Sequence, residues 1–155
     1  MYDLLTVSSL ALEPGFGGNV LRGIGAIALY AVVGLLLMLV GFYAIDLTTP
    51  GKLNQMVRNG SPNAVVVTAS GLISMAFIVV VAIYNAAGKL TEGLLLALIF
   101  GLVGIIVQVL AVRLLEWATR IDIGAILRAD QFTPASLVVA SAHVGLGLVV
   151  AVAIS

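Results

Sequence analysis

Long stretches without a charged residue alternate with short polar segments along this chain of 155 residues. The uncharged stretches cover residues 23–45, 59–88, 93–112 and 131–155. An α-helix of roughly 20 residues, rising about 1.5 Å per residue, crosses a hydrocarbon core about 30 Å thick. The pattern therefore predicts an all-α, polytopic membrane protein with four transmembrane helices, at about 24–45, 64–86, 93–115 and 134–155.

The overall composition agrees with this membrane assignment. Hydrophobic residues make up 62% of the chain and charged residues 9%, and the mean hydropathy is +1.24. Soluble proteins average about 45–50% apolar and about 25% charged residues. The formal net charge is zero, so no basic surface for nucleic acid is expected. The absence of cysteine excludes disulfides and thiolate metal sites.

The first 23 residues precede the first predicted span. They contain Asp3 and Glu13 but no basic residue before Arg22. A cleaved signal peptide would need a positively charged start, so we expect instead an extracytoplasmic segment at the membrane surface, with a turn at Pro14 and Gly15.

The distribution of basic residues predicts the orientation in the membrane. The segments after the first and third spans carry Lys52, Arg58, Arg113, Arg120 and Arg128, whereas the opposite side carries only Arg22 and Lys89. Basic residues accumulate on the cytoplasmic side. We therefore expect both longer connections in the cytoplasm and both termini outside it.

The first of these connections, IDLTTPGKLNQMVRNG at residues 45–60, reads as a helix stop and restart. We expect Thr48 or Thr49 to cap a short interfacial helix that starts at Pro50, and Asn63 to cap the next span. Leu53, Met56 and Val57 would face the membrane from this helix. The residues that define this first elbow are Asp46, Pro50, Gly51, Lys52, Arg58 and Asn63.

The second connection forms a second predicted elbow with Arg113, Glu116, Trp117 and Arg120. Glu116 and Arg120 have the spacing of an exposed ion pair, and Trp117 suits the membrane interface. Ile123, Ile126 and Leu127 should lie along the lipid headgroups. The two elbows could bind a soluble cytoplasmic partner or only anionic lipid.

The chain also resembles itself. Shifted by 71 residues, positions 61–83 align with 132–154 without a gap, and eight of the 23 positions are identical. We interpret this as two tandem two-helix repeats, 24–88 and 89–155. Because each repeat has an even number of spans, both copies should have the same orientation in the membrane.

Small residues predict how the helices pack. The repeat places Ser70 and Ser74 of the second span opposite Ser141 and Gly145 of the fourth, at the four-residue spacing that allows close approach. Further glycines in the first and third spans could accommodate a neighbouring helix or subunit: Gly34, Gly41, Gly101 and Gly104.

The elbow motif resembles a known family. Asp-Leu-x-x-Pro-Gly-Lys-Leu at residues 46–53, followed by Asn63-Ala64, is similar to the domain of unknown function 350 (YjfL-like) family. The similarity covers about residues 30–155, and the second repeat lacks the Pro-Gly-Lys. The resemblance implies a small four-span protein of the bacterial plasma (inner) membrane, and it implies no activity, substrate or catalytic residue.

Candidate chemistry is sparse. His143 is the one histidine, and Asp46, Glu116, Asp122 and Asp130 all lie at or beyond the cytoplasmic ends of the spans. No metal cluster, catalytic triad or phosphate-binding loop is indicated, so we expect neither an enzyme nor a cofactor.

Polar residues within the spans form a predicted layer in the cytoplasmic half of the membrane: Thr68, Ser70, Ser74, Gln108, Ser141 and His143. They could line a pathway with His143 as a titratable switch, or they could only hydrogen-bond between helices. Two functions follow. The chain is either a membrane-embedded assembly or accessory component, as a homo-oligomer or a subunit of a larger complex, or a subunit of a small channel or transporter.

Overall fold

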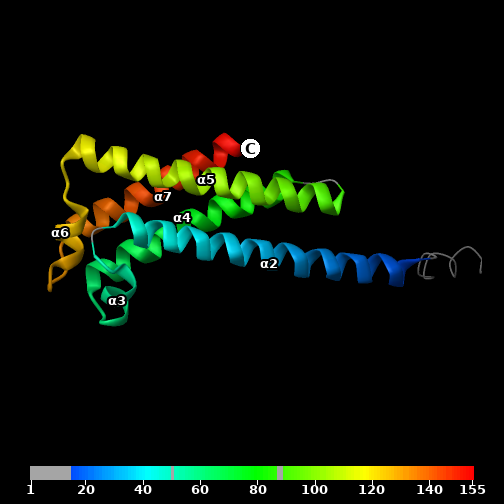
Figure 1. Ribbon diagram of the computed structural model, residues 1–155, viewed down its shortest axis with the longest axis horizontal. Coiled ribbons are helices and arrows are strands. Elements are labelled where there is room, and N and C mark those ends of the chain that lie inside the picture. The colour runs from blue at the N-terminus through cyan, green and yellow to red at the C-terminus, as the bar shows by residue number, and fades with distance from the viewer. Residues whose placement is uncertain (1–14, 50, 87–88) are drawn as a thin grey trace, which may run out of the picture.

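The computed structural model describes residues 15–49, 51–86 and 89–155 (Figure 1). These residues form helices and short connections and contain no strand. The helices are α2 (Phe16–Thr48), α3 (Leu53–Arg58), α4 (Pro62–Asn85), α5 (Leu90–Thr119), α6 (Ile123–Arg128) and α7 (Ala135–Ile154).

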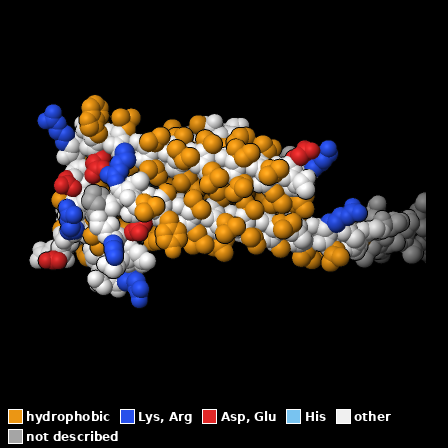
Figure 2. All heavy atoms as spheres, in the orientation of Figure 1, with side chains coloured by type: hydrophobic (Ala, Val, Ile, Leu, Met, Phe, Trp, Pro, Cys, Tyr) orange, Lys and Arg blue, Asp and Glu red, His pale blue; other side chains and the backbone are white. Residues whose placement is uncertain are grey.

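The four long helices α2, α4, α5 and α7 are each long and apolar enough to cross a membrane, and the most apolar 18 residues of each have mean hydropathies of 2.4 to 2.9. Figure 2 shows a belt of hydrophobic side chains between two charged ends. The prediction of four transmembrane helices is therefore confirmed. We call the end that carries α3 and α6 the elbow end, and the end where α4 turns into α5 the hairpin end.

Helix α2 is longer than the sequence pattern predicts. It begins at Phe16, after Gly15 at a φ of 94°, and its 33 residues extend about 50 Å. Residues 16–23, which were expected in a surface segment, continue the first span as helix. The first turns of α2 project past the hairpin end (Figure 1). The expected surface segment at residues 1–14 lies outside the described residues.

Helices α4 and α7 lie side by side and run in the same direction. At the elbow end, the Asn63 side chain of α4 bonds to the segment before α7, and at the hairpin end Asn85 Nδ2 donates to the Ile154 carbonyl at 3.0 Å. A long helix, a six-residue helix and a long helix follow one another twice. A tandem repeat of a two-helix unit is expected to give this arrangement. That the second unit arose by duplication of the first stays a prediction.

The glycines of the outer helices pack against helices of the same chain. A Cβ on Gly41 would lie 3.0 Å from Met75 Cγ of α4, and one on Gly101 would lie 2.5 Å from Leu37 Cδ1 of α2. Gly34 similarly faces α4, and Gly104 faces both α4 and α7. The absence of these side chains therefore brings α2 and α5 close to the bundle.

The two short helices pack inward. Leu53 of α3, and Ile123 and Leu127 of α6, are buried in the hydrophobic core. The expectations that Leu53 faces the membrane and that Ile123 and Leu127 lie along the headgroups are therefore wrong. The apolar side of α6 finds a closer partner in the bundle, because the turn after α5 folds this helix under the ends of α4 and α7.

The predicted capping of the first elbow is also wrong. Helix α2 continues through Thr48, and the hydroxyls of Thr48 and Thr49 donate backward to the carbonyls of Ala44 and Ile45, both at 2.7 Å. Lys52, rather than a threonine, precedes α3. Asp46 Oδ1 accepts from the backbone N–H of Asn54 at 3.2 Å and thereby ties α3 to the end of α2.

Candidate functional site

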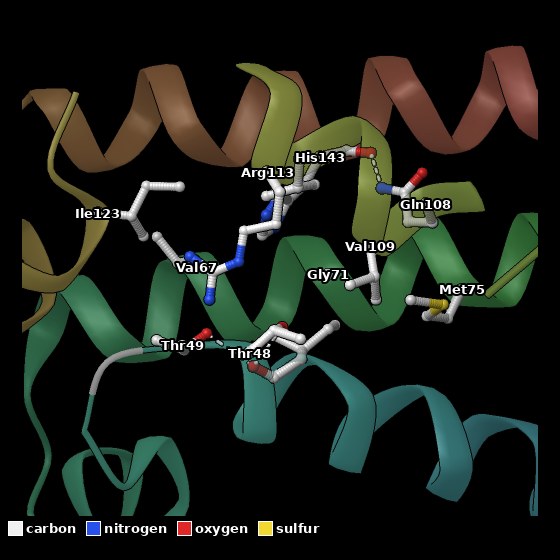
Figure 3. Close-up of a pocket in the computed structure, with 12 residues that line it drawn as sticks. Thr48, Thr49, Val67, Gly71, Met75, Gln108, Val109, Arg113, Ile123 and His143 are labelled. Atoms are coloured by element: carbon white, nitrogen blue, oxygen red, sulfur yellow. Dashed lines mark hydrogen bonds between the residues drawn. The ribbon is translucent and has the colours of Figure 1, made fainter. Parts of the chain in front are cut away.

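A cavity near the elbow end is the strongest candidate site (Figure 3). It offers water-sized molecules a volume of about 30 Å³, which is room for about two water molecules. Its walls come from α2, α4, α5, α7 and the start of α6: Ile45, Thr48, Thr49, Val67, Gly71, Met75, Gln108, Val109, Val112, Arg113, Ile123 and His143. Aliphatic walls with a few polar groups are typical of small-molecule sites.

Gln108 lies on the α5 wall of this cavity and is 2% exposed. Its Nε2 donates to the backbone carbonyl of His143 at 3.0 Å, which fixes the orientation of the amide. Its Oε1 is buried and has no partner among the described residues. A buried acceptor without a donor is costly in hydrocarbon, so this oxygen is a natural position for a bound water or ligand hydrogen.

His143 reaches the cavity from α7 and packs against α4. Its Nδ1 lies 3.5 Å from Ser70 Oγ, and the Ser70 hydroxyl donates to the Val67 carbonyl at 2.8 Å. A Cβ on Gly71 would lie 3.5 Å from the same ring nitrogen. The imidazole therefore occupies the space left by two small residues of α4.

The Arg113 side chain lines the cavity and is 40% exposed, so it marks the mouth of the cavity, and Glu116 pairs with it. Arg113 Nη1 donates to Glu116 Oε2 at 2.6 Å, and Glu116 Oε1 accepts from the backbone N–H of Ile123 at 3.2 Å. The predicted pair of Glu116 with Arg120 is therefore wrong. Helix α5 ends at Thr119, and Arg120 adopts a left-handed conformation with a φ of 57°, so the four-residue helical spacing does not extend to it.

The structure gathers most of the predicted polar layer but not all of it. Thr68, Ser70, Ser74, Gln108 and His143 are buried, whereas Ser141 and Gly145 are exposed. The α7 residue that packs on Ser74 is Gly147: a Cβ there would lie 2.9 Å from Ser74 Cα. The expected pairing of Ser74 with Gly145 is therefore wrong, whereas Ser70 lines a surface groove together with Ser141 and Gly145.

Asn63 has a different role from the predicted helix cap. It is fully buried, and its Nδ2 donates to the carbonyls of Ala129 and Gln131 at 3.2 and 2.8 Å. Its Oδ1 accepts from the backbone N–H of Thr133 at 2.8 Å. Ser61 precedes α4 instead. Asn63 therefore clamps the segment between α6 and α7 onto α4.

The remaining elbow residues lie on the surface. Lys52, Arg58, Trp117 and Arg120 are at least partly exposed, and Gly51 has a φ of 111°, which favours glycine. Pro50 lies outside the described residues. Within the described ranges, no three His, Cys, Asp or Glu residues come together as metal ligands.

Comparison with known proteins identifies the family. Residues 19–154 match the family model described as Domain of Unknown Function (DUF350). The chain belongs to the DUF350 family. It is similar to a UPF0719 transmembrane protein of Mycolicibacterium paratuberculosis, with 35% identity over the full length of both chains. A UPF0719 transmembrane protein of Mycobacterium bovis is 35% identical over 53% of this chain and 55% of the relative. No solved structure matches.

In this DUF350 protein, the motif that carried the family resemblance builds the first elbow. Asp46 bonds to α3, Leu53 is fully buried beneath it, and Asn63 clamps the second elbow while Ala64 packs in the core. These four motif residues therefore determine how the elbows fold, and none of them lines the cavity.

Two positions important for the packing were not anticipated. Gly71 leaves room for Ile45 of α2 and His143 of α7 against α4, and Asn85 joins α4 to α7 at the hairpin end. Gly147 lies one helical turn after His143, a spacing that could have indicated that both face the same neighbour.

Proposed function

We propose that this protein is a membrane-embedded assembly or accessory component without catalytic activity, acting as a homo-oligomer or as a subunit of a larger membrane complex. We place it in the bacterial plasma membrane with the elbow end in the cytoplasm, on the basis of its basic residues and its family. The observation that carries the proposal is the use of intramembrane polar side chains to hold the helices together.

This use recurs along the whole contact between α4 and α7. Asn63 joins them at the elbow end, His143 and Ser70 meet within the membrane, and Asn85 bonds to Ile154 at the hairpin end. Hydrogen bonds between helices, together with close contacts at small residues, stabilise membrane bundles. A bundle held in this way is suited to presenting a fixed outer surface to other membrane proteins.

Helix α2 is the part of this surface that best fits another subunit. Only 11% of its most apolar 18 residues are buried, compared with 50% for α4. A Cβ added to Gly17, Gly18, Gly23 or Gly25 would meet no atom of a neighbouring helix within 4 Å. Each glycine costs a helix about 1 kcal/mol relative to alanine, and close contact with a second helix would offset that cost.

The mass of the protein in lipid nanodiscs, corrected for lipid, tests the oligomer. Ile27 of α2 and Leu95 of α5 are 71% and 60% exposed and both lie near the hairpin end, so single cysteines at these positions form a matched pair for oxidative cross-linking. We expect a mass above that of one chain, and covalent dimers with Ile27→Cys but not with Leu95→Cys. A monomeric mass with neither cross-link would contradict the proposal.

Gln108→Met tests the role of the polar layer. If the hydrogen bond from Gln108 to the His143 carbonyl helps to hold the helices together, this substitution, which keeps the volume and removes the donor, should lower the free energy of unfolding by about 0.5–1.5 kcal/mol. The oligomer mass should stay the same, since the cavity wall and the His143 helix are retained. Unfolding in SDS and the nanodisc mass measure both, and Gln108→Ala, which opens a void, should be clearly less stable.

A second candidate function is a channel or transporter subunit, favoured by the cavity that connects Arg113 with Gln108 and His143. In that case Gln108→Met should change solute or ion flux through proteoliposomes while mass and stability stay constant. Unchanged flux would leave the assembly role as the better account.

A further inference from the structure

We propose that the mouth of this hydrated cavity, at Arg113, binds a phosphate group from the elbow end, with Arg113 as its anchor. This inference concerns a ligand site within one chain. It does not depend on whether the protein forms an oligomer.

The first argument is the position of Arg113. Its side chain is 40% exposed, and Figure 3 shows it extending from α5 into the cavity, toward Thr48 and Thr49 of α2. Its Nη1 bonds to Glu116, and the guanidinium makes no other hydrogen bond to the described part of the chain. The planar group therefore retains donors suited to two oxygens of one phosphate.

Glu116 positions this arginine and limits its affinity for an anion. Its Oε2 holds Arg113, and its Oε1 is engaged by the Ile123 backbone. The carboxylate thus directs the guanidinium toward the mouth while competing with any second anion for its charge. Removing the charge of Glu116 should strengthen anion binding at Arg113, which gives the proposal a second, oppositely directed test.

The inner end of the cavity requires water. The buried Oε1 of Gln108 lacks a donor among the described residues, and the volume of about 30 Å³ accommodates water but not a phosphate. A phosphate at Arg113 would therefore sit at the mouth, with water molecules between it and Gln108. The aliphatic side chains in the walls, such as Val67, Val109 and Val112, offer no hydrogen bonds to these water molecules.

The phosphate could come from a lipid headgroup or from a soluble molecule. The mouth lies where the apolar run of α5 ends at Arg113, which is the depth of the headgroups. Both sources present the same phosphate oxygens to Arg113, so the experiment must separate them.

The experiment uses the absence of natural cysteines. A single cysteine replaces Thr49, which lines the cavity on the side that Arg113 extends toward, or Leu110, which is 62% exposed on the outer face of α5. The protein in dodecylmaltoside, a phosphate-free detergent, is labelled with water-soluble methanethiosulfonates of either charge. Arg113→Gln, Glu116→Gln and the exposed control Arg120→Gln are added to Thr49→Cys, and a single sharp peak in size exclusion establishes that each variant is folded.

We expect Thr49→Cys to react at least about tenfold faster than Leu110→Cys, since a thiol in hydrocarbon does not form the reactive thiolate. The preference for the anionic reagent should fall by about tenfold with Arg113→Gln, rise with Glu116→Gln and stay constant with Arg120→Gln. Slower labelling with inorganic phosphate would assign a soluble ligand, and slower labelling only with phosphatidylglycerol would assign a headgroup.

Three results would overturn the proposal. Equal, slow labelling of both cysteines would mean that water does not reach the mouth of the cavity. If the preference for the anionic reagent stays the same with Arg113→Gln and with Glu116→Gln, Arg113 does not bind the anion. If neither inorganic phosphate nor phosphatidylglycerol slows the labelling, the site does not bind phosphate.

Discussion

Replacing Asn63 with alanine should lower the free energy of unfolding by about 2–4 kcal/mol, because three hydrogen bonds are lost together. Their partners lie 66 to 70 residues away in the segment before α7. With Asn63 absent, the carbonyl of Gln131 and the N–H of Thr133 lose their donor and acceptor. An SDS titration of the protein in detergent micelles measures this loss.

Asn54→Ala is the matched control, since Asn54 is an exposed residue of the neighbouring helix α3 and its side chain makes no hydrogen bond to the described residues. The free energy of unfolding of this variant should remain within about 0.5 kcal/mol of that of the original protein. If Asn63→Ala were as stable as Asn54→Ala, water would be forming the hydrogen bonds to the backbone of the segment before α7. Asn63 would then not be a clamp.

The second large effect concerns two glycines of α7. We expect Gly147→Ala to destabilise the protein by about 1–3 kcal/mol through overpacking. The new Cβ would lie 2.8 Å from Ser74 Cβ and 2.9 Å from Ser74 Cα, so α4 and α7 must separate. Gly145→Ala meets open space and should be neutral or stabilising by up to about 1 kcal/mol, because alanine favours helix.

SDS titration of both variants compares the two possible faces of α7 directly. The repeat alignment places Gly145 in the contact with α4, whereas the structure places Gly147 there. A loss of stability with Gly145→Ala and none with Gly147→Ala would therefore support the repeat alignment against the structure. Ser74→Gly in the Gly147→Ala background should restore part of the loss, since it removes the side-chain atoms that clash.

Local sequence signals predicted the short helix of the first elbow correctly, but they did not predict the contacts that hold either elbow. Pro50 and the threonines before it resemble a helix start, yet the Thr48 and Thr49 hydroxyls bond backward within α2. Similarly, Glu116 has both an i−3 and an i+4 basic neighbour, and only Arg113 lies on the helix with it. Such choices depend on where a helix ends, which the sequence indicates only to within a few residues.

The candidate site was predictable in composition and not in geometry. Gln108 and His143 stand out as polar residues in apolar spans, and the sequence placed them in one layer. That Arg113 joins them at one cavity depends on the contact of α5 with α2 and α7. The cavity is a property of packed side chains from five helices, and no motif of consecutive residues describes it.

The sequence by itself determined that this protein crosses the membrane four times, because the length of an uncharged run sets whether a helix can span hydrocarbon. It also located both elbows, since charges and turn residues must remain near water. Only the tertiary structure decided which face of α7 meets α4. Moving the contact from Ser141 and Gly145 to His143 and Gly147 turns the helix by about 200°. Helix α7 is apolar on nearly all sides, so hydrophobicity cannot determine which face meets α4. The fit of Gly147 to Ser74 and of His143 to Ser70 determines it.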